Sequence, residues 1–237
     1  MASSDDSPQF QLDRKKRRHG FEKAAETYDV VAVLQQEIGD RLLQRLDYIK
    51  QKPARVLDLG SGTGYISKDL LQRYSKTRVI AVDIAINMLK KTAQHRKWLR
   101  KPNVVCAAAE ALPFNNDTFD MVISNLMLQW CDDLPQVFTG INRILAPNGL
   151  LTFTTFGPDT LRELRESWSK VDHYEHTSTF QDMHDVGDAL MQAGFQQPVV
   201  DMETITLTYT SLTALMKDLK NIGASNAASK RNKGLTG

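Results

Sequence analysis

Hydrophobic and polar positions divide this chain into short apolar runs that alternate with amphipathic stretches. Compact apolar runs predict buried strands at 55–59, 78–83, 103–108, 119–124 and 149–156. Apolar residues at three- and four-residue spacing predict helices at 21–50, 65–74, 86–99, 134–145, 160–169, 182–193 and 210–222. Strands that alternate with helices form right-handed crossovers, so the pattern predicts a parallel sheet with helices on both faces.

The same pattern sets the domain organisation. Residues 1–20 are polar and end in the basic run D-R-K-K-R-R-H-G, so we expect a disordered, solvated tail. Residues 21–237 form one domain, with a cofactor-binding core at 50–156. An insert at 157–181 follows the fifth strand and is expected to cover the site at the carboxyl edge of the sheet. Alternating apolar residues over 199–209 predict one more strand.

Composition excludes several classes of protein. Hydrophobic residues make up 41% and charged residues 24%, as in ordinary globular domains. The net charge of +2 is too small for nucleic-acid binding through bulk charge. No apolar run reaches the roughly 18–20 residues of a membrane span, and the N-terminus has no signal core. Cys106 and Cys131 lack ligand spacing. We expect a monomeric, soluble, cytoplasmic protein that binds neither nucleic acid nor membrane.

A glycine loop, Gly60-Ser-Gly-Thr-Gly64, follows the first strand, where ligands of open α/β sheets bind. Its G-x-G-x-G spacing differs from the G-x-G-x-x-G of dinucleotide sites, which disfavours a hydride-transferring enzyme. Asp58 would repel a pyrophosphate, but it suits the α-ammonium and sulfonium groups of S-adenosylmethionine. Asp83, at the end of the second strand, suits the ribose diol. These features together favour a cofactor site over a simple tight turn.

The chain resembles the class I methyltransferase family through motifs in the order V-L-D-L-G-S-G-T-G (56–64), V-D-I-A-I-N-M-L (82–89), A-E-A-L-P-F (109–114), F-D-M-V-I-S-N (119–125) and R-I-L-A-P-N-G (143–149). The resemblance implies a doubly wound Rossmann-like fold that binds S-adenosylmethionine and releases S-adenosylhomocysteine. It implies that Gly60 and Gly62 contact the methionine part, Asp83 the ribose and Met88 the adenine. The implied cofactor-binding set is Asp58, Gly60, Gly62, Gly64, Asp83, Ile84, Met88, Ala109, Glu110 and Asn125.

One cofactor contact departs from that family. The family often carries an aspartate that binds the adenine amino group after the third strand, and the matching position here is Ala108. Glu110 and Leu112 are its polar and apolar neighbours. The sequence leaves open which residue meets the adenine edge.

Narrower motifs are similar to the malonyl-acyl-carrier-protein O-methyltransferase family of biotin synthesis, namely 21–29 (F-E-K-A-A-E-T-Y-D), 124–135, 156–164, 182–195 and 205–209. The resemblance implies methyl ester formation on the carboxylate of a malonyl thioester carried by acyl carrier protein. It implies an N-terminal helical lid in which Tyr28 has a site role, although ordinary packing is an equal alternative. The family continues past residue 237 to a final antiparallel strand beside strand five, so we expect that strand to be missing.

The acceptor needs a partner for its negative charge. A malonyl carboxylate is ionised near neutral pH, so methyl transfer requires alignment rather than a general base. A buried carboxylate needs a paired donor, and Arg162 or Arg165 could supply it, although each could equally lie on a solvated helix face. Gln129 and Trp130 could wall the acyl pocket or simply pack in the core. Histidines at 173 and 176 lack the spacing of a known metal site, and we expect no metal.

Two basic clusters could dock an acidic carrier protein. They are 14–18 and the group Arg96, Lys97, Arg100 and Lys101. Solubility is the plain alternative for both clusters. Two further functions remain open: a class I methyltransferase for another small acceptor such as a quinone, and a methyltransferase-like binding protein without catalysis.

Overall fold

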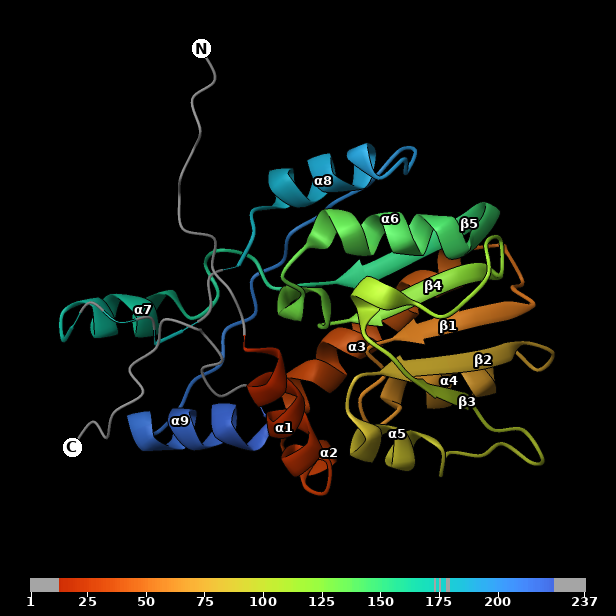
Figure 1. Cartoon of the computed structure of the whole chain (residues 1–237). Helices are drawn as coiled ribbons and strands as arrows, with labels where there is room; N and C mark the ends of the chain where they lie inside the picture. The colour runs from red at the N-terminus through yellow and green to blue at the C-terminus, as the bar shows by residue number, and fades with distance from the viewer. Residues whose placement is uncertain (1–12, 173, 175, 178–179, 224–237) are drawn as a thin grey trace, which may run out of the picture.

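A parallel β-sheet forms the centre of the molecule in the computed structural model, which describes residues 13–223 except 173, 175 and 178–179 (Figure 1). Within these residues the sheet has five strands: β1 (Arg55–Leu59), β2 (Arg78–Asp83), β3 (Asn103–Cys106), β4 (Phe119–Asn125) and β5 (Leu145–Thr154). Their order is β3-β2-β1-β4-β5, and all neighbouring pairs are parallel. The order reverses between β1 and β4, which places a ligand site beyond their carboxyl ends.

Helices cover both faces of the sheet, which confirms the predicted fold class. The α-helices are α1 (Arg14–Ala24), α2 (Tyr28–Val31), α3 (Val33–Arg45), α4 (Tyr65–Arg73), α5 (Ile86–Thr92), α6 (Leu134–Ile144), α7 (Arg162–Ser169), α8 (Met183–Gln192) and α9 (Leu212–Asn221). Three 3-10 turns are η1 (Leu46–Tyr48), η2 (Ala109–Ala111) and η3 (Leu128–Trp130). One apolar cluster joins the sheet to α6 and α8, and another joins it to α3 and α4. Burial of these two faces is the main stabilising contribution.

The N-terminal basic run is helical, so the prediction of a disordered tail is wrong for residues 14–20. Asp13 caps α1 by accepting a hydrogen bond from the backbone N–H of Lys16 at 3.0 Å. Glu22 then accepts hydrogen bonds from the first two N–H groups of α5, at Ile86 and Asn87, both at 2.8 Å. These contacts fix α1 against α5. Residues 1–12 lie outside the described part of the chain.

The predicted helix over 86–99 is too long. The helix α5 ends at Thr92, and Trp98 is 91% exposed in a loop closed by a bridge between Lys97 and Arg100. Arg100 donates to the carbonyls of Leu71, Tyr74 and Thr77, which holds this loop at the end of α4. A tertiary contact therefore overrides the local helical pattern.

The predicted strand over 199–209 is also wrong, because these residues form no strand. Val199 is 94% exposed and Met202 is 69% exposed, so the apolar side chains of this segment do not alternate between core and solvent. In the described part of the chain, β5 pairs with β4 and has no partner on its other side. Its residues from Gly149 to Thr154 are accordingly only half-buried.

Two further properties of the described residues bear on the setting of the protein. None of the helices in this part of the chain combines the length and the apolar character that a membrane span requires. Cys106 and Cys131 are both free thiols.

Candidate functional site

The glycine loop sits at the carboxyl ends of β1 and β2 and requires its glycines. Gly60 has a φ of +77°, and a Cβ atom there would lie 2.2 Å from Cγ of Met127. Gly64 has a φ of +92°, and its Cβ atom would lie 2.7 Å from a ring carbon of His95. The N–H groups of Gly60 and Ser61 both donate to the carbonyl of Val82. The loop is thus pinned to β2 with its backbone open to a ligand.

Asp83 ends β2 and lines a cavity beside this loop. One carboxylate oxygen accepts from the N–H of Gly62 at 2.9 Å, and the other accepts from the N–H of Ala85 at 2.8 Å. Burial raises the pKa of Asp83, and these backbone donors act in the opposite direction. A carboxylate offers about four lone-pair positions, so acceptor capacity remains for a vicinal diol.

Asp58 lies beneath the loop rather than in the cavity wall. Its side chain is 1% exposed, and Oδ2 accepts from the hydroxyl of Ser67 at 2.6 Å. Its other oxygen has no hydrogen-bond partner among the described residues. Burial raises the pKa of Asp58 to about 7, the Ser67 hydrogen bond lowers it, and the charge of Asp83 raises it further.

The cavity has a volume of about 110 Å³ and brings together most of the predicted cofactor residues. The predicted residues that line it are Tyr28, Gly60, Gly62, Asp83, Ile84, Met88, Ala109, Glu110 and Asn125. Asp58, Gly64, Arg162 and Arg165 do not line it. These assignments stay predictions about cofactor contact, but the fold has gathered them from β1, β2, α5, η2, β4 and the N-terminal segment.

The N-terminal segment closes one side of the cavity. The ring of Phe21 meets that of Trp130 edge to face, with centroids 5.3 Å apart. Asp29 accepts a hydrogen bond from the hydroxyl of Thr63, which ties the start of α2 to the glycine loop. Tyr28 faces the cavity, and burial together with the charges of Asp83 and Asp29 raises its pKa. Tyr28 therefore stays a neutral phenol that can donate a hydrogen bond.

Several residues that line this cavity were not predicted as site residues, and Arg17 is the charged one among them. Arg17 lines it and is only 6% exposed, although it belongs to the run that was predicted to be solvated. Arg17 lies four residues before Phe21, and residues at this spacing share one helix face. That spacing was the available signal, because Phe21 belongs to the lid motif.

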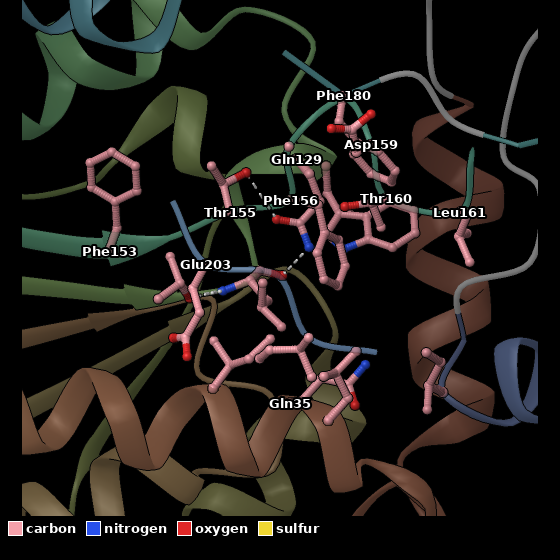
Figure 2. A pocket seen from close by; sticks show the side chains of 18 of the residues that line it. Gln35, Gln129, Phe153, Thr155, Phe156, Asp159, Thr160, Leu161, Phe180 and Glu203 are labelled. Carbon is pink, nitrogen blue, oxygen red and sulfur yellow. Dashed lines mark hydrogen bonds between the residues drawn. The ribbon is translucent and has the colours of Figure 1, made fainter. Parts of the chain in front are cut away.

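A larger space of about 2240 Å³ adjoins the cofactor cavity and shares Gln35, Gln129, Trp130 and Phe156 with it. Figure 2 shows Gln129, Thr155 and Phe156 gathered on one side, with Gln35 of α3 opposite. The side-chain amide of Gln129 donates to the carbonyl of Leu126 at 2.7 Å, and the hydroxyl of Thr155 donates to Gln129 at 3.4 Å. These contacts orient Gln129 at the junction of the two spaces.

The two predicted acceptor arginines belong to the 157–181 insert. Arg162 lines the larger space, is 59% exposed and lies 3.6 Å from Asp159 and 3.9 Å from Glu166. Arg165 donates to the carbonyls of Thr160 and Pro158, and this ties the turn before α7 to the helix. Arg162 is thus the better placed of the two for an acceptor in the larger space.

The described histidines do not form a metal centre. His176 donates a hydrogen bond from Nε2 to Asp172 at 2.7 Å and stacks on Trp168 with centroids 4.0 Å apart. His184 pairs with Asp182 at the start of α8. Among described residues, no group of three or more potential ligands is placed to hold a metal ion. His173 lies outside the described residues.

Comparison with known proteins gives close relatives over almost the whole chain. The chain is 50% identical over 224 residues to the malonyl-[acyl-carrier protein] O-methyltransferase of Halorhodospira halophila, covering 94% of this chain and 76% of the relative. It is 48% identical over 235 residues to that of Gallionella capsiferriformans, covering 97% and 81%. The chain belongs to the malonyl-[acyl-carrier protein] O-methyltransferase family.

Other matches agree with this O-methyltransferase family. Residues 57–153 match the model of the methyltransferase domain family. Among solved structures, the fold is similar to a Thermotoga maritima S-adenosylmethionine-dependent methyltransferase, with a TM-score of 0.59, 20% identity and coverage of 76% and 81%. The YcgJ protein of Bacillus subtilis gives a TM-score of 0.59 at 17% identity, with coverage of 76% and 82%. Family and fold make the chain an S-adenosylmethionine-dependent methyltransferase.

Proposed function

We propose that this enzyme transfers the methyl group of S-adenosylmethionine to the free carboxylate of malonyl-acyl carrier protein. The products are a malonyl methyl ester on the carrier and S-adenosylhomocysteine. The observation that carries this proposal is the 46–50% identity, over 94–97% of the chain, to relatives that bear this activity in their names. Cytoplasmic location, action as a monomer without a metal, and a place in biotin synthesis belong to the same proposal.

The residues of the cavity fit this cofactor. Asp83 keeps acceptor positions for the ribose hydroxyls after its two backbone contacts, and Gly60 lets the methionine part approach the loop closely. Ile84 and Met88 offer apolar surface for the adenine ring. Asp58 lies under the loop and supports the α-ammonium group through the electrostatic field rather than by direct contact.

The chemistry asks for positioning more than for proton transfer. The cofactor supplies an activated sulfonium methyl group when it is bound. The acceptor carboxylate is already ionised, so the protein has to hold its oxygen in line with that methyl group and keep water out. The lid residues Phe21 and Tyr28 close one side, and Gln129 and Trp130 stand where the acceptor enters from the larger space. Tyr28, as a neutral donor, can orient the carboxylate.

Product mass tests this function directly. We expect purified protein, S-adenosylmethionine and malonyl-acyl carrier protein to give a carrier that is heavier by one methyl group. Acetyl-acyl carrier protein has no free carboxylate and should stay unchanged, and Asp83→Ala should lose most of the activity. A malonyl carrier of unchanged mass, from protein that binds S-adenosylhomocysteine, would reject malonyl transfer and leave another acceptor or a binding role.

A further inference from the structure

Arg17 is a buried cation that lines the cofactor cavity. Among the described residues that line this cavity, it is the one cation. Arg17 is 6% exposed, and its Nη1 atom has no hydrogen-bond partner among the described residues. An unpaired charge is costly to bury, and a bound ligand of opposite charge would offset that cost.

The nearby acidic residue does not serve as that partner. Oε1 of Glu110 lies 3.5 Å from Nη2 of Arg14, and among the described residues no ion pair joins Glu110 to Arg17. Burial and then the charge of Glu110 raise the pKa of the Cys131 thiol to about 12, while the charge of Arg17 lowers it. Arg17, Glu110 and Cys131 are therefore neighbours at one end of the cavity, and the positive charge of Arg17 remains available to a ligand.

Helix α1 holds this guanidinium in place. Asp13 caps the helix at one end, and Glu22 anchors it to the N-terminus of α5 at the other. Between them, Phe21 packs on Trp130 one turn after Arg17. An arginine on such a fixed helix is preorganised for a planar anion, which it can bind through two parallel hydrogen bonds.

We propose that Arg17 binds a carboxylate group inside the cavity and acts as its anion anchor. Under the proposed function, on which this inference rests, two ligands bring a carboxylate there: the amino-acid part of the cofactor and the malonyl acceptor. Methylation removes the charge of the acceptor, so an anchor for the acceptor would release the ester more readily than the free acid. Arg162 and Arg165 sit outside this cavity, so Arg17 is a different candidate from both.

Calorimetry with the whole chain can tell whether Arg17 binds the carboxylate of the cofactor or that of the malonyl acceptor. Arg17→Gln removes the charge and keeps most of the side-chain volume, and Arg17→Lys keeps the charge but loses the paired donors. Arg18→Gln is the matched control, since Arg18 is the next residue on α1 and its side chain is 53% exposed. The ligands are S-adenosylhomocysteine, 5′-methylthioadenosine, which lacks the amino-acid part, and malonyl-pantetheine added to protein saturated with S-adenosylhomocysteine.

If Arg17 holds the cofactor carboxylate, Arg17→Gln should lower the affinity for S-adenosylhomocysteine about thirtyfold or more and leave the affinity for methylthioadenosine unchanged. If Arg17 holds the acceptor, only the affinity for malonyl-pantetheine should fall by that factor. The affinities of Arg17→Lys should lie between those of Arg17→Gln and the wild type. Because Nη1 has no hydrogen-bond partner in the part of the chain that the structure describes, the thermal midpoint of Arg17→Gln should equal or exceed that of the wild type.

Unchanged affinity for both carboxylate ligands overturns the proposal, as does an equal loss in Arg18→Gln. A loss of methylthioadenosine affinity together with a lower thermal midpoint also overturns it, because Arg17 would then be a structural residue. A wild type that binds S-adenosylhomocysteine but not malonyl-pantetheine contradicts the proposed acceptor, while the S-adenosylhomocysteine comparison still decides the role of Arg17.

Discussion

Asp58 shows how a residue can serve a site without lining it. The carboxylate is buried under the glycine loop with one hydrogen bond from Ser67 and one oxygen without a described partner. Burial in a low-dielectric site favours its protonated form. A ligand that brings an ammonium group close to the loop favours the ionised form. Cofactor binding and ionisation of Asp58 should therefore be coupled.

This coupling predicts a pH-dependent affinity. The pKa of Asp58 in the free protein is raised to about 7, so its ionised fraction grows as pH rises from about 6 to 8. Affinity for S-adenosylhomocysteine should grow with it, by up to about tenfold. Calorimetry across this range measures the slope. Asp58→Asn should bind weakly with a flatter profile, and any slope that remains belongs to Asp83; equal slopes in both proteins would contradict the coupling.

At the scale of elements, the β1–α4 turn depends on one glycine more than on any other. A Cβ atom at Gly60 would collide with both Cβ and Cγ of Met127, at 2.4 Å and 2.2 Å. The positive φ adds about 1–2 kcal/mol of strain for a residue with a side chain. Met127 lines the cofactor cavity, so its displacement would change the site as well as the turn.

Gly60→Ala should therefore lower the thermal midpoint and weaken the binding of S-adenosylhomocysteine at least about tenfold, an effect of about 1.4 kcal/mol. The matched control is Gly140→Ala within α6, where an added Cβ meets nothing within 4 Å. This control should keep the affinity and gain about 0.5–1 kcal/mol of stability, because alanine favours helix. Differential scanning fluorimetry and calorimetry measure both effects. Identical results for the two variants would contradict the steric argument.

The sequence predicted helices and strands best where buried apolar residues recur at regular spacing. The strand β2 and the helix α6 are apolar wherever they are buried, so their patterns are strong. The pattern failed where one distant contact decides the conformation, as Arg100 does for the loop after α5. It also failed for 199–209, where apolar residues alternate along a segment that forms no strand.

The site was predictable to the extent that its residues lie in local motifs. The glycines and Asp83 sit on adjacent turns of the βαβ unit, so spacing alone places them together. Arg17 and the Gln129–Trp130 junction come from segments that meet only in the folded chain. The basic run alone does not show which of its residues turns inward, and only the four-residue spacing to Phe21 marks Arg17.

At the scale of the whole molecule, the two basic clusters lie at opposite ends of the parallel strands. The cluster around Arg96 and Lys101 precedes β3 at the amino edge of the strands, whereas α1 lies at the carboxyl edge near the cavity (Figure 1). The acceptor is proposed to arrive on an acidic carrier protein, and a carrier has to dock where its thioester can reach the cavity. The exposed side of α1, with Lys15 and Arg18, is therefore the expected docking surface.

Charge reversal on the two edges tests this placement. Lys15→Glu/Arg18→Glu should raise KM for malonyl-acyl carrier protein several-fold at low salt and leave kinetics with malonyl-pantetheine near the wild type. Arg96→Glu/Lys101→Glu, at the other edge, should change neither. Added salt should shrink the difference, because exposed charges are screened over about 10 Å at 0.1 M ionic strength. An equal effect of both pairs would point to net charge instead of docking.

The attachment of α1 also has a consequence for how the enzyme is made. A ribosome releases residues 14–24 first, but the helix rests on the start of α5 through Glu22 and on Trp130 through Phe21. The start of α5 follows Glu22 by 64 residues, and Trp130 follows Phe21 by more than a hundred, so both supports are synthesised well after the helix. Synthesis runs from the N-terminus, and folding generally follows the same order. The first helix of this chain therefore cannot dock until the segments that support it have been synthesised. Helix α1 can thus close the cofactor cavity only after segments far along the chain have been synthesised.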